Sequence, residues 1–225
     1  MSAPRLICDL DGTLIDSAAS LCAAGNALLA ELGRPPVTVE TYKTFIGKGM
    51  DVQVERLLAH SGGAPEAGLE ACRRRFRELY DPTAHSRAYP GAVAALRRLA
   101  AEGWRIGVCT QKPQAPAWRV LRALGFDMIE SLAGGDSVPG ALKPDPRMLA
   151  AAAAPLGDGP AVYVGDSETD AETARAGDMP FLLFLGGYRH GPAEAMRPAA
   201  VFAHHDALPA LARAAAGLAP GAGAA

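Results

Sequence analysis

Short apolar runs, most of them separated by stretches with helical periodicity, constrain the fold of this chain more than any other feature. Each run has the length of a buried strand. The runs are Leu6–Leu10, Arg105–Thr110, Met128–Ala133, Ala161–Gly165 and Phe181–Leu185. The helical stretches are Pro90–Glu102, Pro113–Leu124, Arg147–Pro155 and Thr169–Ala176. Alternating strands and helices predict an α/β fold, a Rossmann-like core with a mostly parallel sheet covered on both faces.

Residues 16–85 depart from this rhythm, because they contain helix-like stretches and no strand-like alternation. The stretches are Ser17–Leu32, Val39–Phe45, Met50–Ala59 and Pro65–Tyr80. We expect them to form a small helical cap inserted after the first strand. Residues 1–15 and 86–225 would then form the core, with hinges near Gly12 and Ser86–Gly91. The tail, residues 217–225, is rich in Ala, Gly and Pro and is predicted to be flexible.

Composition and charge narrow the classes of function. The chain has 225 residues, 49% of them hydrophobic, which is enough for one core domain with a smaller insertion. Its net charge is −2, so no basic excess indicates nucleic acid or a membrane surface as a partner. No apolar stretch reaches about 18 residues, and Asp9 and Asp11 interrupt the place where a signal peptide would be apolar. We therefore expect a soluble, cytoplasmic protein, and the oligomeric state stays open.

The cysteines and histidines have no spacing typical of metal ligands. The cysteines are Cys8, Cys22, Cys72 and Cys109. They form no Cys-x-x-Cys pair, which is consistent with reduced, buried thiols. We expect the pair His204–His205 to lie in a surface loop.

Two carboxylates follow the first apolar run at once. If that run is a strand, Asp9 and Asp11 share one side of its carboxyl end, where open α/β sheets bind ligands. Two carboxylates on one side repel each other unless a cation or a proton relieves them, which indicates metal binding, acid–base chemistry or both. A Ca²⁺ loop is excluded, because Gly12 directly follows Asp11 and Ala18 occupies the position of the final Glu ligand. A plain solvated turn remains an alternative.

Further polar residues end or follow other predicted strands. They are Thr110, Lys143, Asp166 and Asp170. Because parallel strands place their carboxyl ends at one edge of the sheet, we expect these side chains to meet Asp9 and Asp11. Each residue also has a plainer interpretation. Thr110 would suit a helix N-cap, a lysine is ordinarily on the surface, and the two aspartates would suit the start of a helix near Ser167.

In this order, and over nearly the whole chain, the motifs resemble those of the haloacid dehalogenase-like hydrolase superfamily. They read Asp-x-Asp-Gly-Thr-Leu-x-Asp-Ser from Asp9, a strand-end Thr110, Lys-Pro-x-Pro from Lys143, and Gly-Asp-Ser-x-x-Asp from Gly165. Within that superfamily the chain is most similar to the phosphoglycolate phosphatase-like subgroup, on account of Ile46–Met50 in the cap and Tyr-Pro-Gly at 89–91. The resemblance implies the same core and helical cap.

The resemblance also implies a two-step hydrolysis. Asp9 would be the nucleophile that accepts the phosphoryl group. Asp11 would protonate the leaving oxygen and then activate water, so its carboxyl should lie off the metal. Lys143 would act on the phosphoryl oxygens and beside Asp9 as a catalytic positive charge.

The remaining implied roles concern phosphate and Mg²⁺. Thr110, Gln111 and Lys143 would bind phosphate, although Gln111 stands where close relatives have Asn, so only its backbone contact is expected. Mg²⁺ would be the cofactor, because it prefers oxygen ligands. Its ligands would be Asp9, Asp166 and the backbone carbonyl of Asp11. Asp170 would either bind the ion directly or contact one of its ligands.

The substrate is expected to be a small phosphorylated metabolite, with 2-phosphoglycolate the best single candidate. In the cap, Lys43, Gly47 and Lys48 are candidates for contact with the distal group of the substrate, and a plain surface loop is an equal alternative. Another small phosphate ester, pyrophosphate or a nucleotide remains possible as the substrate. A 2-haloacid dehalogenase would need neither metal nor Asp11, and a non-catalytic phosphate-binding protein would be expected to lack Asp9 or Asp11.

Overall fold

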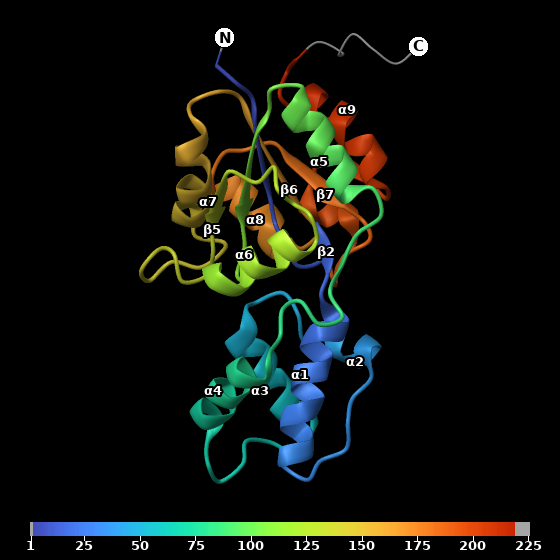
Figure 1. Ribbon diagram of the computed structural model, residues 1–225, viewed down its shortest axis with the longest axis vertical. Coiled ribbons are helices and arrows are strands. Elements are labelled where there is room, and N and C mark those ends of the chain that lie inside the picture. Colours follow the sequence, from blue (N-terminus) through green and yellow to red (C-terminus); the bar gives the residue numbers. More distant parts are fainter. Residues whose placement is uncertain (1, 219–225) are drawn as a thin grey trace.

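The computed structural model describes residues 2–218 and places a layered α/β unit beside a group of helices (Figure 1). Within these residues six strands form one sheet in the order β5-β4-β1-β6-β7-β8, with every neighbouring pair parallel. The strands are β1 (Arg5–Cys8), β4 (Arg105–Cys109), β5 (Ser131–Ala133), β6 (Ala161–Gly165), β7 (Phe181–Phe184) and β8 (Ala200–Phe202). The predicted α/β class with a parallel sheet is confirmed.

Strand β8 was not predicted. The other five strands of the sheet lie within or one residue beyond the apolar runs seen in the sequence. Strand β8 is only three residues long and forms the outer edge of the sheet, where the side chain of Val201 is exposed. A strand this short gives too few residues for an alternating pattern to be recognised.

Helices cover both faces of the sheet because alternate residues of each strand point to opposite sides. In β1, Leu6 and Cys8 pack in one core and Ile7 in the other. The first core contains residues of α5 (Ala92–Ala101), α6 (Gln114–Ala123) and α9 (Leu208–Ala215). The second contains residues of α7 (Pro146–Ala153) and α8 (Glu168–Ala176). Three short 3₁₀ helices complete this unit, η1 (Ala154–Leu156), η2 (Ala193–Met196) and η3 (His205–Ala207).

Four helices between β1 and β4 form a separate group, which we call the cap helices. They are α1 (Ala18–Glu31), α2 (Val39–Lys43), α3 (Met50–His60) and α4 (Leu69–Leu79). Figure 1 shows them beyond one end of the sheet, and they share an apolar cluster that includes Tyr42, Leu57 and Phe76. The chain enters and leaves this group through β2 (Ile15–Asp16) and β3 (Arg87–Ala88), which pair antiparallel. The domain boundaries at residues 16 and 85 stay a prediction.

Two predictions about single residue types have different outcomes. All four cysteines are free and buried, as expected. His205, expected in a surface loop, is instead only 1% exposed, and its Nε2 donates a hydrogen bond to the carbonyl of Thr13, 3.0 Å away. Within residues 2–218 no helix is long and apolar enough to cross a membrane. Most of the tail that was predicted to be flexible lies outside the described residues.

Candidate active site

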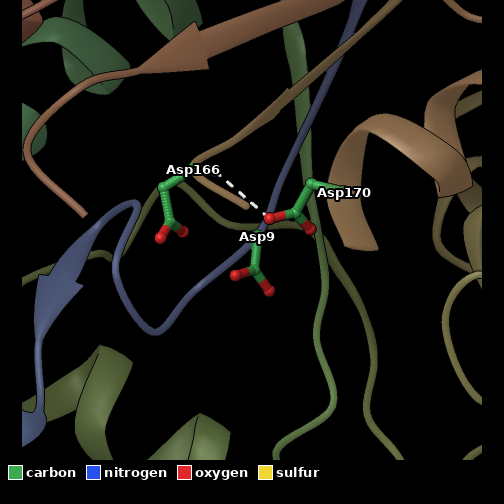
Figure 2. A group of neighbouring side chains, drawn as sticks. All are labelled: Asp9, Asp166 and Asp170. Atoms are coloured by element: carbon green, nitrogen blue, oxygen red, sulfur yellow. Dashed lines mark hydrogen bonds between the residues drawn. The ribbon is translucent and has the colours of Figure 1, made fainter. Parts of the chain in front are cut away.

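Three buried carboxylates gather at the carboxyl edge of the sheet (Figure 2). Asp9 follows β1, Asp166 follows β6, and Asp170 lies in the first turn of α8. One oxygen of each lies within 4.8 Å of the others. We call these three residues the acidic cluster. Carboxylate oxygens so close together are a donor set suited to a hard divalent cation.

The charge of the acidic cluster is only partly compensated by the protein. Burial raises the pKa of Asp9 to about 7, although the nearby Lys143 ammonium opposes the shift. Burial, and then the charges of Asp170 and Asp9, also raise the pKa of Asp166 well above its usual range. Because a cation would favour the charged form of both groups, these shifts support a metal site at the cluster.

Lys143 lies at the centre of the site and not on the surface. Its Nζ donates hydrogen bonds of 2.7 Å to Asp9 Oδ1 and to Asp170 Oδ1, and its side chain is 3% exposed. Burial alone would lower the pKa of Lys143, but the carboxylates of Asp170 and Asp9 raise it, so the side chain is an ammonium. It therefore brings a fixed positive charge to the carboxylate of Asp9.

Asp170 has two roles, because each of its oxygens has different partners. Oδ1 accepts from Lys143 and from the hydroxyl of Tyr163, at 2.7 and 2.8 Å. Oδ2 accepts from the backbone N–H groups of Asp166 and Ser167 and from the Ser167 hydroxyl. The bond from the Ser167 backbone N–H is part of a capping box at the start of α8. The helix-capping interpretation of this residue is thus realised within the cluster.

Asp166 is held in place by two loops whose glycines approach it closely. The Thr13 hydroxyl donates to Oδ1 and the Tyr188 backbone N–H donates to Oδ2, both at 2.7 Å. A Cβ at Gly12 or at Gly187 would lie 2.5 or 2.2 Å from Oδ2, so neither position accepts a side chain without movement. No role was predicted from the sequence for Thr13, Gly187 or Tyr188.

Asp11 lies apart from the acidic cluster, as expected of a carboxyl that stays off a metal. Its two carboxylate oxygens are 2.7 and 3.0 Å from the Nζ of Lys112, which is buried. Burial alone would lower the pKa of Lys112, but the charge of Asp11 raises it. Sequence reasoning missed Lys112, although it is the third residue of the motif that begins at Thr110.

The motif after β4 also lines the site. Thr110 is buried, and its hydroxyl accepts from the backbone N–H of Lys112 at 3.1 Å, while the N-cap position of α6 belongs to Pro113. Gln111 donates from Nε2 to the carbonyl of Lys143 at 3.1 Å. The Gln111 Oε1 atom is buried and has no hydrogen-bond partner among the described residues.

A pocket lies over these residues and is bounded on its other side by the cap. The cap residues that line it are Leu21, Ile46, Gly47, Gly49, Met50 and Gln53. Of the predicted cap contacts, the structure brings Gly47 to this pocket. Lys48 lines a neighbouring cleft, and Lys43 pairs with Glu40 at 2.8 Å on the surface of α2.

Gln53 in α3 was not predicted. Its side chain is buried at the pocket, and its Oε1 has no hydrogen-bond partner within residues 2–218. A buried amide oxygen without a partner costs free energy, so its presence at a pocket indicates a polar ligand. Only its spacing from the Gly-Lys-Gly sequence of the cap could have pointed to it.

Comparisons with known proteins found one family model and several similar proteins. The family model described as haloacid dehalogenase-like hydrolase matches residues 5–178. A protein of Cereibacter sphaeroides named phosphoglycolate phosphatase is 46% identical over 214 residues, which are 93% of this chain and 98% of the relative. A phosphoglycolate phosphatase of Rhodospirillum rubrum is 40% identical and is aligned over 88% of this chain and 86% of its own length.

Solved structures are similar over the core and the cap helices together. One from Haemophilus somnus, described as a predicted phosphoglycolate phosphatase, has a TM-score of 0.85 and 26% identity, and it covers 92% of this chain and 97% of its own. CbbY from Rhodobacter sphaeroides, solved with phosphate, has a TM-score of 0.73 at 23% identity, covers 92% of this chain and 96% of its own, and supports the fold alone.

Proposed function

Because this chain belongs to the haloacid dehalogenase-like hydrolase family, as its motifs predicted, we propose that it is a Mg²⁺-dependent phosphatase of 2-phosphoglycolate. The observation that carries the reaction is the placement of Asp9 in the acidic cluster beside Lys143, with Asp11 apart from it. The choice of substrate is supported by the relatives named phosphoglycolate phosphatase, of which several are more than 40% identical.

The proposed reaction has two steps in which the aspartates exchange roles. A carboxylate oxygen of Asp9 attacks phosphorus, and the glycolate oxygen leaves with a proton from Asp11, which gives an aspartyl phosphate. Asp11, now a carboxylate, takes a proton from water, which attacks the phosphorus, releases phosphate and restores Asp9. Mg²⁺, held by Asp9, Asp166 and the Asp11 carbonyl, with Asp170 either a further ligand or a support for one, would neutralise the repulsion between carboxylate and phosphate.

Phosphate binding is assigned to groups at the ends of β4 and in the loop before α7. We propose that the Thr110 hydroxyl, the Gln111 backbone N–H and the Lys143 ammonium hold the phosphoryl oxygens. The burial of Thr110 and Lys143 in the lining of the pocket supports these roles, since donors in a dry site act on charge more strongly than in water.

The cap is proposed to select the distal group of the substrate. Gly47 and Gln53 are supported as contacts by their place in the pocket lining. The Nε2 of Gln53 could donate to the carboxylate of the substrate, whereas its unpaired Oε1 would need a donor. Lys48 is proposed at longer range from the neighbouring cleft. Lys43 would contact the substrate only after its pairing with Glu40 is broken, so it is the weakest of the three predicted contacts.

Two other functions have less support. A dehalogenase would have no use for the acid Asp11, which this chain keeps in a defined place by Lys112. A non-catalytic phosphate-binding protein would have no need of both Asp9 and Asp11. We further propose a reducing compartment, the cytoplasm, because the four cysteines are free.

The test is phosphate release from a panel of phosphate monoesters, with Mg²⁺ or with a chelator. We expect kcat/KM to be highest for 2-phosphoglycolate and to vanish with the chelator. Asp9→Asn should abolish turnover, whereas Asp127→Asn makes the same chemical change at an exposed site and should not. Equal activity on every ester of the panel would rule out 2-phosphoglycolate as the specific substrate. Full turnover of Asp9→Asn would refute the covalent mechanism, and silence on every ester would refute the phosphatase.

A further inference from the structure

Lys112 contacts both the loop after β1, which carries Asp11, and the cap helices. On one side its Nζ lies 2.7 and 3.0 Å from the two carboxylate oxygens of Asp11. On the other side the same Nζ lies over the ring of Tyr80, 5.1 Å from the ring centroid. Asp11 belongs to the loop after β1, and Tyr80 ends the last cap helix, α4. The lysine side chain is 2% exposed, so these neighbours replace water around its charge.

We propose that Lys112 is a positioning residue that holds the carboxyl of Asp11 toward the cap and away from the acidic cluster, where it meets the leaving oxygen of the substrate. This inference rests on the proposed function, because it assigns a partner to the acid of that reaction. It adds a role for a residue that lies outside the acidic cluster.

A device of this kind is needed because Asp11 is only two residues from Asp9. A carboxylate this close to a bound divalent cation is itself a suitable ligand. A carboxyl that coordinated the metal would face the acidic cluster and would not reach the leaving oxygen of the substrate. Lys112 opposes that outcome by engaging both oxygens of Asp11 at once.

The cap helices fix Lys112 in turn. The ring of Tyr80 is stacked on Phe76, with centroids 6.2 Å apart and planes at 15°, and Phe76 is fully buried in the apolar cluster of the cap. A cation over an aromatic face is attracted to it, most strongly where water is excluded. The position of the acid therefore depends on the cap through one lysine.

The experiment compares two esters that differ in their need for an acid. The alkoxide of 2-phosphoglycolate leaves poorly without a proton, whereas the phenolate of p-nitrophenyl phosphate leaves without one. Lys112→Met keeps the length of the side chain and removes its charge. We expect it to lower kcat/KM for 2-phosphoglycolate by about 10²-fold, the low end of general-acid effects, and for the aryl ester by less than about threefold.

A second arm separates positioning from damage to the fold. Val120→Ala deletes buried methyl groups of α6 in the core and controls for lost stability, with no selective loss expected. In an Asp11→Asn background, Lys112→Met should cause no further loss on 2-phosphoglycolate, because the two residues act as one unit. Lys112→Arg should restore part of the selective loss, since guanidinium binds a carboxylate in the same two-point way.

The outcomes distinguish the two proposals. Equal losses on both esters, or a further loss in the Asp11→Asn background, would overturn the positioning role in an enzyme that still works as proposed. A wild-type chain that releases phosphate from neither ester would refute the proposed function and this inference with it.

Discussion

Replacing His205 by Gln tests whether protonation of this buried ring lowers the free energy of unfolding in acid. The His205 ring is packed against Phe184 and Phe202, with centroids 4.5 and 5.5 Å away. Its Nε2–H donates to the carbonyl of Thr13, whose hydroxyl donates to Asp166. Its Nδ1 is buried without a partner among the described residues. A second proton on this ring would enter a desolvated site, although the Asp206 carboxylate and the backbone of Pro90 favour it.

The size of the effect follows from linkage. Burial lowers the pKa of His205 from 6.5 to about 4, although the hydrogen bond to Thr13 opposes the shift. A group whose pKa is depressed by folding contributes stability above its unfolded pKa, and that stability is lost as the pH falls toward the folded value. Between pH ~8 and pH ~5 the wild type loses about 2 kcal/mol of its free energy of unfolding through His205. The Gln variant does not lose this contribution, because Gln does not titrate.

The assay is urea unfolding of the wild type and of His205→Gln in chelator at both pH values. Asp9 and Asp166, whose raised pKa values favour the folded state in acid, act equally in both proteins and cancel in the difference. We expect the variant to gain about 2 kcal/mol on the wild type between pH ~8 and pH ~5. A difference that stays constant within about 0.5 kcal/mol would show that His205 titrates normally and that the reasoning from burial is wrong.

Three further predictions concern the acidic cluster. Gly187→Ala would crowd Asp166 from Oδ2 to Cβ, and we expect half-maximal activity to need about tenfold more Mg²⁺ and the chelated protein to melt at a lower temperature. Ser167→Ala removes the cap of α8 and should cost about 1 kcal/mol in urea unfolding. Because burial raises the pKa of Asp9 to about 7, the stability that protonation gives the chelated protein is lost as the pH rises through that value. Thermal melts should therefore show Mg²⁺ stabilising the protein more at pH ~8 than at pH ~6, and an equal effect at both would contradict this.

The strand ends could be predicted because the necessary signals are local. A short apolar run followed by Asp and Gly is recognisable without its neighbours, and parallel strands then place Asp9 and Asp166 at one edge. Two of the three members of the acidic cluster follow from that rule, and Asp170 joins them from the first turn of α8. Lys143, which was predicted to lie near Asp9, is 2.7 Å from it in the loop before α7, although most lysines lie on the surface.

The missed residues depend on contacts that are distant in sequence. Lys112 is 101 residues from Asp11, so nothing beside it in the chain shows that it is buried against a carboxylate. His205 is buried because the short edge strand β8 brings it beneath Phe184, and that strand was itself missed. Gln53, and not Lys43, faces the pocket because of the way the cap helices lie over the sheet, which periodicity does not reveal.

The cap side of the pocket comes almost entirely from one short segment, residues 46–53, and Leu21 is the remaining described contributor. The reactive carboxylates and Lys143 come from loops of the core. If the cap selects the substrate as proposed, substrate selection and the chemical step depend on separate stretches of the sequence. Substitutions confined to residues 46–53 would then change the preferred ester and leave the reaction itself unchanged.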